Sequence, residues 1–271
     1  VYGRMAVTPG NYLRVINGSS ASASGTRSDQ VNCIGDQGGG EFGRLEYLGN
    51  TCNLVFQYEK PYADKSGMGH ANIPDGVYTL SYSGKAKNRW ISDVLYEYQY
   101  TKCQSGKVHD RPATEEDFRK RPKRVYERDG EYYKVVGGCD NYFTNGEYRS
   151  SWTHFGRCIG NPLFFTGYNE GHVRVKDDDG NVIRDEYAPY WSVINNFLLA
   201  HHFAVSGRLF RKAPYKLMLT YSSNCGRYGG FFDQHKRQLS AAWMGEIPAG
   251  KTGLTLTYGL YADKGSVYED T

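Results

Sequence analysis

Residues 88–102 read NRWISDVLYEYQYTK, and this stretch decides which fold the chain is expected to have. Apolar and polar residues alternate along it, which is the pattern of a strand whose two faces meet different surroundings. One face carries Trp90, Val94, Tyr96, Tyr98 and Tyr100, and the other carries Asp93, Glu97 and Gln99. A soluble β-sandwich would bury the aromatic face, whereas a membrane β-barrel would turn it toward lipid and keep the polar face wet.

The same alternation predicts strands on both sides of this stretch. It forms a hairpin with residues 77–83, and residues 44–49 form another with residues 53–59. The other predicted strands are residues 2–8, 11–17, 172–176, 181–185, 196–209, 215–221, 238–246 and 252–263. Residues 191–205 also fit a helical face, but residues 215–221 repeat the strand pattern after a short turn, which favours a strand. The chain is therefore predicted to be all-β and antiparallel, with His201 and His202 on opposite faces.

The connections between these strands alternate in length. They are long at 18–40, 61–76 and 222–236, very long from 103 onward, and short at 49–52, 84–87, 211–214 and 246–251. Such alternation places every long loop at one end of the sheet, as in outer-membrane barrels. We therefore expect residues 1–271 to form a single domain, an antiparallel transmembrane β-barrel of the outer-membrane type. Residues 103–193 form a large external excursion within it.

Composition excludes several classes of protein. The net charge is +4, with 33 basic against 29 acidic residues, which is too balanced for a nucleic-acid binder. No run of 18 apolar residues exists, so a helical membrane span is excluded. The six cysteines show no CxxC pair and no histidine at zinc spacing, and Asp177, Asp178 and Asp179 lack the spacing of a calcium loop. No metal and no cofactor are predicted.

The excursion carries a basic run after a short helical signal. Thr114 to Asp117 resembles a capping box, which predicts about one helical turn. The run that follows consists of Arg119, Lys120, Arg121, Lys123 and Arg124. It is either a solvated loop or an anion-facing patch for acidic polysaccharide or lipid phosphates. Cys103 and Cys139 bracket this segment, and we predict a disulfide between them that closes a loop at the barrel mouth.

Within the excursion, residues 140–152 read DNYFTNGEYRSSW and residues 154–162 read HFGRCIGNP, after YTKCQSGKVHDRP at 100–112. These segments resemble capsule-assembly outer-membrane proteins of the Wzi type, in the Bacteroidetes-like form common among gut Gram-negative anaerobes. The resemblance covers roughly residues 88–262 and extends to residues 196–210 and 214–229. Its most compact signature is Gly156-Arg157-x-Ile159-Gly160.

The resemblance implies a monomeric barrel in the bacterial outer membrane, exposed at the cell surface and without catalytic activity. It implies a lectin-like protein that binds capsular or exopolysaccharide and helps to anchor or assemble the capsule, with outer-membrane lipid and lipopolysaccharide as its other partners. Proteins of this family are longer and end on a final strand with a terminal aromatic residue. The present chain is therefore expected to be a fragment of an incomplete barrel.

Sugar recognition combines aromatic faces with planar polar groups, and the excursion supplies both. The candidate platforms are Tyr142, Trp152 and His154, and the candidate polar partners are Asn145, Glu147, Arg149 and Arg157. The competing interpretation is that these aromatic residues fill the lumen or line the membrane girdle.

Two other functions remain open at this point. One is a porin-type channel for small solutes. The other is a soluble all-β carbohydrate-active enzyme with two carboxylates, for which Glu97, Glu147 and Glu170 are candidates that no spacing pairs.

Overall fold

The computed structural model describes residues 8–17, 19–21, 34, 38–63, 65–107, 110–120, 122–145, 148–176, 182–248, 250 and 253–267. Most of them lie in antiparallel β-structure, so the protein is all-β as predicted. The chain divides into two compact units. Unit 1 comprises Val1–Gly39, Tyr62–Ile73 and Gln104–Asn196, and unit 2 comprises Gly40–Pro61, Pro74–Cys103 and Phe197–Thr271. The predicted excursion at 103–193 therefore makes up most of unit 1.

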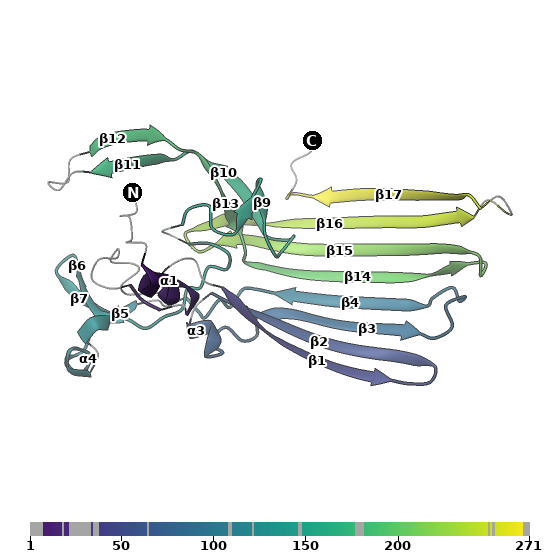
Figure 1. The fold of residues 1–271 in the computed structure, drawn as a ribbon, viewed down its shortest axis with the longest axis horizontal. Coiled ribbons are helices and arrows are strands. Elements are labelled where there is room, and N and C mark those ends of the chain that lie inside the picture. Colours follow the sequence, from purple (N-terminus) through teal and green to yellow (C-terminus); the bar gives the residue numbers. More distant parts are fainter. Residues whose placement is uncertain are drawn as a thin grey trace. The chain divides into compact units, whose positions relative to one another are not determined.

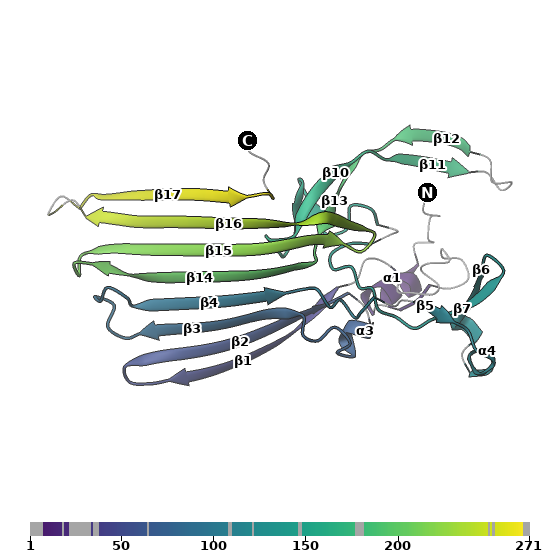
Figure 2. The ribbon, with the colours of Figure 1, turned by 180° about the vertical axis from the view of Figure 1, so that it is seen from behind.

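Unit 2 is built on one eight-stranded sheet with the order β1-β2-β3-β4-β14-β15-β16-β17 (Figures 1 and 2). Its strands are β1 (Gly39–Leu48), β2 (Cys52–Tyr62), β3 (Gly76–Gly84), β4 (Asp93–Tyr100), β14 (Leu198–Leu209), β15 (Ala213–Arg227), β16 (Gly230–Pro248) and β17 (Thr255–Gly265). Apart from β4 and β14, which pair although the strands β5–β13 lie between them in the chain, each strand pairs with the next in chain order, as successive hairpins do. The predicted hairpins of this sheet are therefore confirmed, including the strand interpretation of residues 196–209. The strand predicted at 88–102 is shorter than expected, because β4 begins at Asp93, so Trp90 lies in the connection before it and the predicted short turn at 84–87 extends to residue 92.

The predicted long connection at 222–236 is wrong. Strands β15 and β16 continue through this region and meet at a two-residue turn, Tyr228-Gly229. Gly226 and Gly229 have φ of 98° and 78°, a conformation that glycine adopts at little cost. The polar residues of this region suggested a loop, but they belong to strands.

Strands β1 and β17 are the two edges of the sheet, so the described residues form an open sheet and not a closed barrel. The alternation along the strands separates the side chains onto two faces. Cross-strand register aligns Phe56, Leu80, Tyr96, Phe203, Leu219 and Ala241 on one face. It aligns Gln57, Thr79, Glu97, His202, Thr220, Ser240 and Asp263 on the other. We call these the apolar face and the polar face.

Unit 1 contains short elements. These are α1 (Pro9–Ile16), α3 (Lys65–Met68), β5 (Asp110–Pro112), α4 (Glu115–Lys120), the 3-10 helix η1 (Pro122–Arg124), β6 (Val125–Arg128), β7 (Glu131–Val135), β8 (Thr153–His154), β9 (Arg157–Cys158), β10 (Phe165–Asn169), β11 (His172–Lys176), β12 (Val182–Tyr187) and β13 (Tyr190–Asn195). They form the sheet β5-β7-β6 and the pairs β8-β9, β10-β13 and β11-β12.

The predicted strand at residues 11–17 is wrong, because Pro9–Ile16 is the helix α1. The Thr8 hydroxyl accepts a hydrogen bond from the Asn11 amide, and Pro9 occupies the first helical position. Both are standard features of a helix start, and they outweigh the short alternation in the sequence. Residues 2–7 lie outside the described residues. The hairpin β11-β12 confirms the prediction for 172–185, and the Asp177–Asn181 turn lies outside the described residues.

Candidate functional site

The first residues of the segment 140–152 are buried and hold unit 1 together. The Tyr142 side chain is 1% exposed, and its hydroxyl accepts a hydrogen bond from Asn72 Nδ2 at 2.8 Å. Asn196 Nδ2 donates to the Tyr142 carbonyl at 2.8 Å, and Gln104 Nε2 donates to the Asn196 carbonyl at 3.1 Å. Buried amides need such partners, so these contacts fix the chain path of residues 140–143. Tyr142 has no ring face open to a sugar, and we remove it from the candidate platforms.

The next aromatic residues are half-buried. Trp152 packs edge-on against Phe143 with ring centroids 5.7 Å apart, and Phe143 packs against Phe164 at 5.4 Å. The Trp152 carbonyl accepts a hydrogen bond from the Ile159 amide at 2.8 Å, which closes the base of the β8-β9 hairpin. Trp152 therefore combines a supporting position with a partly open indole.

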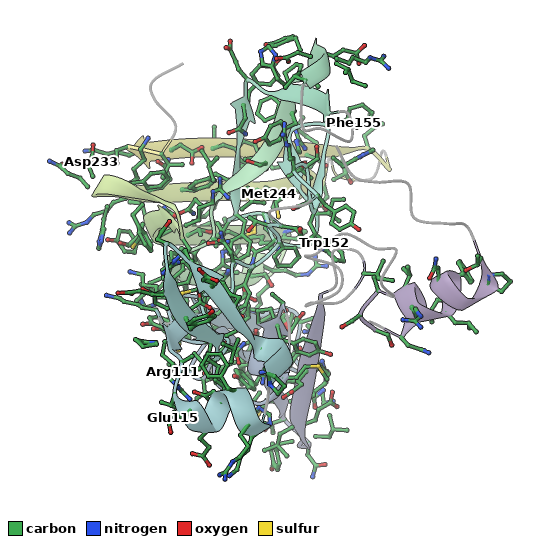
Figure 3. All side chains as sticks on the ribbon, turned by 90° about the vertical axis from the view of Figure 1, so that its left-hand side faces the viewer. Arg111, Glu115, Trp152, Phe155, Asp233 and Met244 are labelled. Atoms are coloured by element: carbon green, nitrogen blue, oxygen red, sulfur yellow. The ribbon has the colours of Figure 1, made fainter. Side chains whose placement is uncertain are left out.

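The tip of this hairpin presents an exposed aromatic residue. Thr153 and His154 pair with Cys158 and Arg157, and Phe155-Gly156 form the turn. Phe155 is 91% exposed, and its ring lies 4.3 Å from that of His154 (Figure 3). An exposed phenylalanine on a two-residue turn is surface that a ligand can contact. His154, beside it, stays a candidate platform.

Three further aromatic side chains continue this surface. Trp191 lies against Gly156, and its carbonyl accepts a hydrogen bond from Thr153 Oγ1 at 3.1 Å. The rings of Trp191 and Tyr168 are cross-strand neighbours with centroids 5.6 Å apart. A hydrogen bond with Tyr187 raises the pKa of Tyr168. We call Phe155, Trp191, Tyr168 and Tyr187, all of which are exposed, the aromatic strip.

Polar groups contact the strands that carry the aromatic strip and their neighbour β11. Arg149 donates to the His172 carbonyl at 2.9 Å, and its guanidinium lies 5.6 Å from the centre of the Tyr190 ring. His172 Nδ1 is 2.7 Å from Asp185 Oδ1, and its ring packs edge-on against Tyr187 at 5.7 Å. Rings with guanidinium, imidazole and carboxylate groups beside them provide the two kinds of contact that sugars use.

The other predicted polar partners are distributed differently. Arg157 is exposed, directly across the hairpin from His154. Asn145 Oδ1 accepts a hydrogen bond from the Tyr148 amide at 3.2 Å, so this side chain stabilises a turn. Glu147 lies outside the described residues. The structure thus gathers His154 and Arg157 at one hairpin and gives Asn145 a local structural contact.

Cys158, inside the compact signature of the resemblance, is shielded. Burial raises the pKa of its thiol to about 11, so the thiolate is scarce at neutral pH.

The predicted Cys103–Cys139 disulfide is wrong. The Cys139 thiol is free and donates to the Lys107 carbonyl at 2.8 Å. Burial also raises the pKa of this thiol.

The basic run begins in the last turn of a helix whose start is anchored by an ion cluster. The predicted helical turn is confirmed as α4. Asp117 Oδ2 accepts from Arg111 at 2.7 Å and from the Thr114 amide at 2.9 Å, while Oδ1 accepts from Lys134 Nζ at 2.6 Å. The hydrogen bonds from Arg111 and then Lys134 hold the pKa of Asp117 far below its usual range. Figure 3 labels Arg111 of this cluster and Glu115, the first residue of α4.

The predicted anion patch is partly engaged elsewhere. Lys120 forms an ion pair with Glu116 at 2.6 Å, one helical turn away. Arg119 and Arg124 are exposed. Arg121 and the side chain of Lys123 lie outside the described residues. Two exposed guanidinium groups therefore remain as the described part of the patch.

Of the carboxylates proposed for an enzyme, Glu97 belongs to unit 2 and Glu170 to unit 1, and Glu147 is not among the described residues. Within the described ranges no three His, Cys, Asp or Glu side chains gather closely enough to hold a metal ion. Among the same residues no helix is long and apolar enough to cross a membrane.

Comparison of the chain with protein-family models, with curated proteins and with solved structures finds no match. The candidate site therefore stands on its own geometry. Its residues Phe155, Tyr168, Tyr187 and Trp191 were not singled out from the sequence, because their partners lie on other strands. Local signals existed in the glycine after Phe155 and in the Tyr-Trp pair that opens β13.

Proposed function

We propose that this protein is an outer-membrane, barrel-type protein that binds surface polysaccharide through the aromatic strip of unit 1. The observation that carries the proposal is the reversed exposure of the sheet in unit 2. On the apolar face Leu80 is 53% and Leu239 46% exposed, whereas on the polar face Gln99 and Gln238 are each 5% exposed. A sheet in water buries its apolar side chains, whereas a transmembrane barrel wall turns them outward to lipid.

The lengths of the strands support the same proposal. Strands β1 to β4, β14 and β17 have 8 to 12 residues each. A tilted transmembrane β-strand needs about 9–11 residues.

Aromatic residues occur at two levels of the apolar face. Tyr58, Tyr78, Tyr98, His201 and Tyr221 fall in one register row across five strands. Nearer the other end of the strands, Tyr215 stacks on Trp243 at 5.3 Å, and Trp243 Nε1 donates to the Tyr258 hydroxyl at 3.3 Å. Transmembrane barrels carry two such girdles where the hydrocarbon meets the headgroups. The row Phe56, Leu80, Tyr96, Phe203 and Leu219 lies between the two levels.

The polysaccharide part of the proposal rests on the aromatic strip. A pyranose ring presents CH groups on one face, which stack on aromatic rings, while its hydroxyls bond to planar polar groups. Phe155 and Trp191 offer the rings, and Arg149 and the His172–Asp185 pair offer the polar groups. We propose a non-catalytic, lectin-like role in anchoring or assembling capsule, as a monomer, in line with the Wzi-type resemblance.

The experiment uses the full chain in detergent and polysaccharide purified from the surface of the producing cells. Replacing Phe155 and Trp191 by alanine is expected to abolish binding, because a sugar ring stacks on the face of an aromatic side chain and alanine has no such face. Phe210→Ala is the matched control, because this phenylalanine is also exposed on a turn but belongs to unit 2. Equal binding by both variants would exclude the strip as the site. Separately, recovery of the protein in the aqueous phase after detergent partition would exclude the membrane location.

A second candidate is a channel for small solutes, and the polar face of unit 2 favours it. A sheet closed around that face would enclose hydroxyl, amide, carboxylate and imidazole groups, as porin walls do. Single-channel recording in planar bilayers separates the two functions. A polysaccharide-binding anchor that keeps its lumen filled conducts little, whereas a porin gives steps that scale with salt concentration.

A further inference from the structure

The polar face of unit 2 holds a row of side chains that the binding of polysaccharide in unit 1 does not use. The row runs through Gln57, Thr79, Glu97, His202, Thr220, Ser240 and Asp263. Its members are bonded in pairs. Thr79 donates to Glu97 Oε2 at 3.3 Å, and His202 Nδ1 lies 2.7 Å from Thr220 Oγ1. In the part of the chain that the structure describes, no hydrogen bond joins Glu97 to His202, although they are neighbours in the row.

Glu97 and His202 are direct cross-strand partners on β4 and β14. Each is fixed by a threonine on its outer side, which leaves Oε1 of Glu97 and Nε2 of His202 without a hydrogen-bond partner among the described residues. Opposite residues in antiparallel strands have Cβ atoms about 5 Å apart, so one small group can reach both side chains. Both residues are half-buried, so neither side chain is fully covered.

Gln99 supplies an independent observation. It lies two residues beyond Glu97 on the same face and is buried, and its Nε2 has no hydrogen-bond partner in the described structure. A buried amide donor without a partner is costly, so in native proteins it marks the place of a water molecule or a ligand group. Its cross-strand partner Ala200 ends at a methyl group, which offers the amide no hydrogen-bonding group.

We infer that Glu97, His202 and Gln99 form a binding subsite for a neutral, hydroxyl-rich ligand, of the class of sugars. The carboxylate accepts hydrogen bonds, the amide nitrogen donates them and the imidazole nitrogen can do either, which suits a group of adjacent hydroxyls. One carboxylate beside an imidazole gives no positive charge for a phosphate or sulfate. Within the described residues no third ligand completes a metal site. The subsite lies in unit 2 and is independent of the aromatic strip.

The test uses the full chain in detergent with Phe155 and Trp191 replaced by alanine, so that the aromatic strip contributes nothing. Neutral oligosaccharides of glucose, galactose and mannose are titrated by calorimetry. In this background we expect one of them to bind, and His202→Phe to weaken it about tenfold, the effect of losing one hydrogen bond to a polar ligand. His201→Phe is the matched control, because this neighbouring histidine faces the apolar side, where it contacts Tyr96 at 2.8 Å.

Gln99→Leu is the second variant and separates binding from folding. Removing an unpaired buried donor leaves stability unchanged or raises it, so any loss of affinity reports on the ligand. We expect about a tenfold loss with an unchanged near-ultraviolet circular dichroism spectrum. Failure of every oligosaccharide to bind overturns the inference, as do equal affinities of the His202→Phe and His201→Phe proteins or an unchanged affinity of Gln99→Leu. Loss of binding only in the strip variants concerns the polysaccharide proposal and leaves the subsite intact.

Discussion

The indole of Trp191 rests on the backbone of Gly156, so closely that a Cβ at Gly156 would lie 3.1 Å from the ring. Gly156 also has φ of 72°, which an L-residue adopts only with strain. This one contact ties the turn of the β8-β9 hairpin to β13. It therefore connects the two ends of the aromatic strip that lie furthest apart in sequence.

Gly156→Ala is expected to displace Trp191 and to weaken polysaccharide binding while the rest of unit 1 stays folded. Gly130→Ala is the matched control, because Gly130 has a similar φ of 81° but nothing within 4 Å of its Cβ position. Both variants carry a backbone strain of about 1–2 kcal/mol, and only Gly156→Ala adds the contact with the indole. Tryptophan fluorescence and binding measured on both proteins isolate that contact. Equal binding by the two variants would mean that the position of Trp191 is not required.

Leu80→Arg tests whether the apolar face meets lipid. At the middle of a transmembrane barrel wall, an outward arginine costs about 2–4 kcal/mol of folding free energy. Leu80 is already half exposed, so the same change in water would cost little. Ser81→Arg is the control, because the next residue points to the polar face. Urea unfolding from lipid vesicles measures both variants, and a Leu80→Arg protein as stable as the control contradicts the membrane proposal.

The Asp117 cluster gives a prediction about pH. Because hydrogen bonds from Arg111 and Lys134 lower the pKa of Asp117, its contribution to stability is present above the unfolded pKa of about 4 and is lost as the pH falls below it. Amide exchange in β5, β7 and α4 is therefore expected to be equally protected at pH 5 and pH 8. Protection should decline below about pH 4.

Asp117→Asn should remove this protection at every pH, because it leaves two cations beside a neutral amide. Glu116→Gln provides the comparison, since its pair with Lys120 is exposed and contributes little. Equal exchange rates in the two variants would show that the cluster does not hold α4 against the sheet.

Much of unit 2 was predictable because its information is local. The alternation in residues 93–100 and 215–221 needs no knowledge of distant residues, and a two-residue period leaves only one choice of face. The ends of β15 and β16 were missed because residues 222–236 are mostly polar residues and glycines, with adjacent Phe231 and Phe232, so they show no apolar–polar alternation. The helix α1 was missed although Thr8-Pro9 is a recognisable start.

The candidate site was less predictable, because burial depends on contacts between distant residues. Tyr142 and Trp152 look equally suited to stacking in the sequence. Tyr142 is buried because Asn72, 70 residues earlier, bonds to its hydroxyl. Trp191 joins the site because β13 pairs with β10 and brings it beside Tyr168. Neither relationship leaves a local pattern.

The tightest glycine contact in unit 2 supplies the last prediction. A Cβ at Gly207 would lie 1.8 Å from the Trp90 carbonyl oxygen, which is backbone and cannot rotate away. The segment before β4 follows the end of β14 closely, since the Arg208 amide donates to the Arg89 carbonyl and the Ser92 amide to the Ser206 carbonyl, each at 2.8 Å. Gly207→Ala must therefore push these two backbones apart and break hydrogen bonds on both sides.

We expect Gly207→Ala to lower the free energy of unfolding by about 1–3 kcal/mol, the range for overpacking at a rigid contact. Gly43→Ala is the control, because Gly43 lies within β1 with nothing within 4 Å of its Cβ position. There the alanine restricts the unfolded chain and should stabilise the protein by about 0.4–1 kcal/mol. Because one variant should be less stable and the other more stable than the original protein in the same detergent, an effect of the detergent alone cannot produce the difference. If both variants unfold at the same denaturant concentration, the segment before β4 is not packed closely against β14.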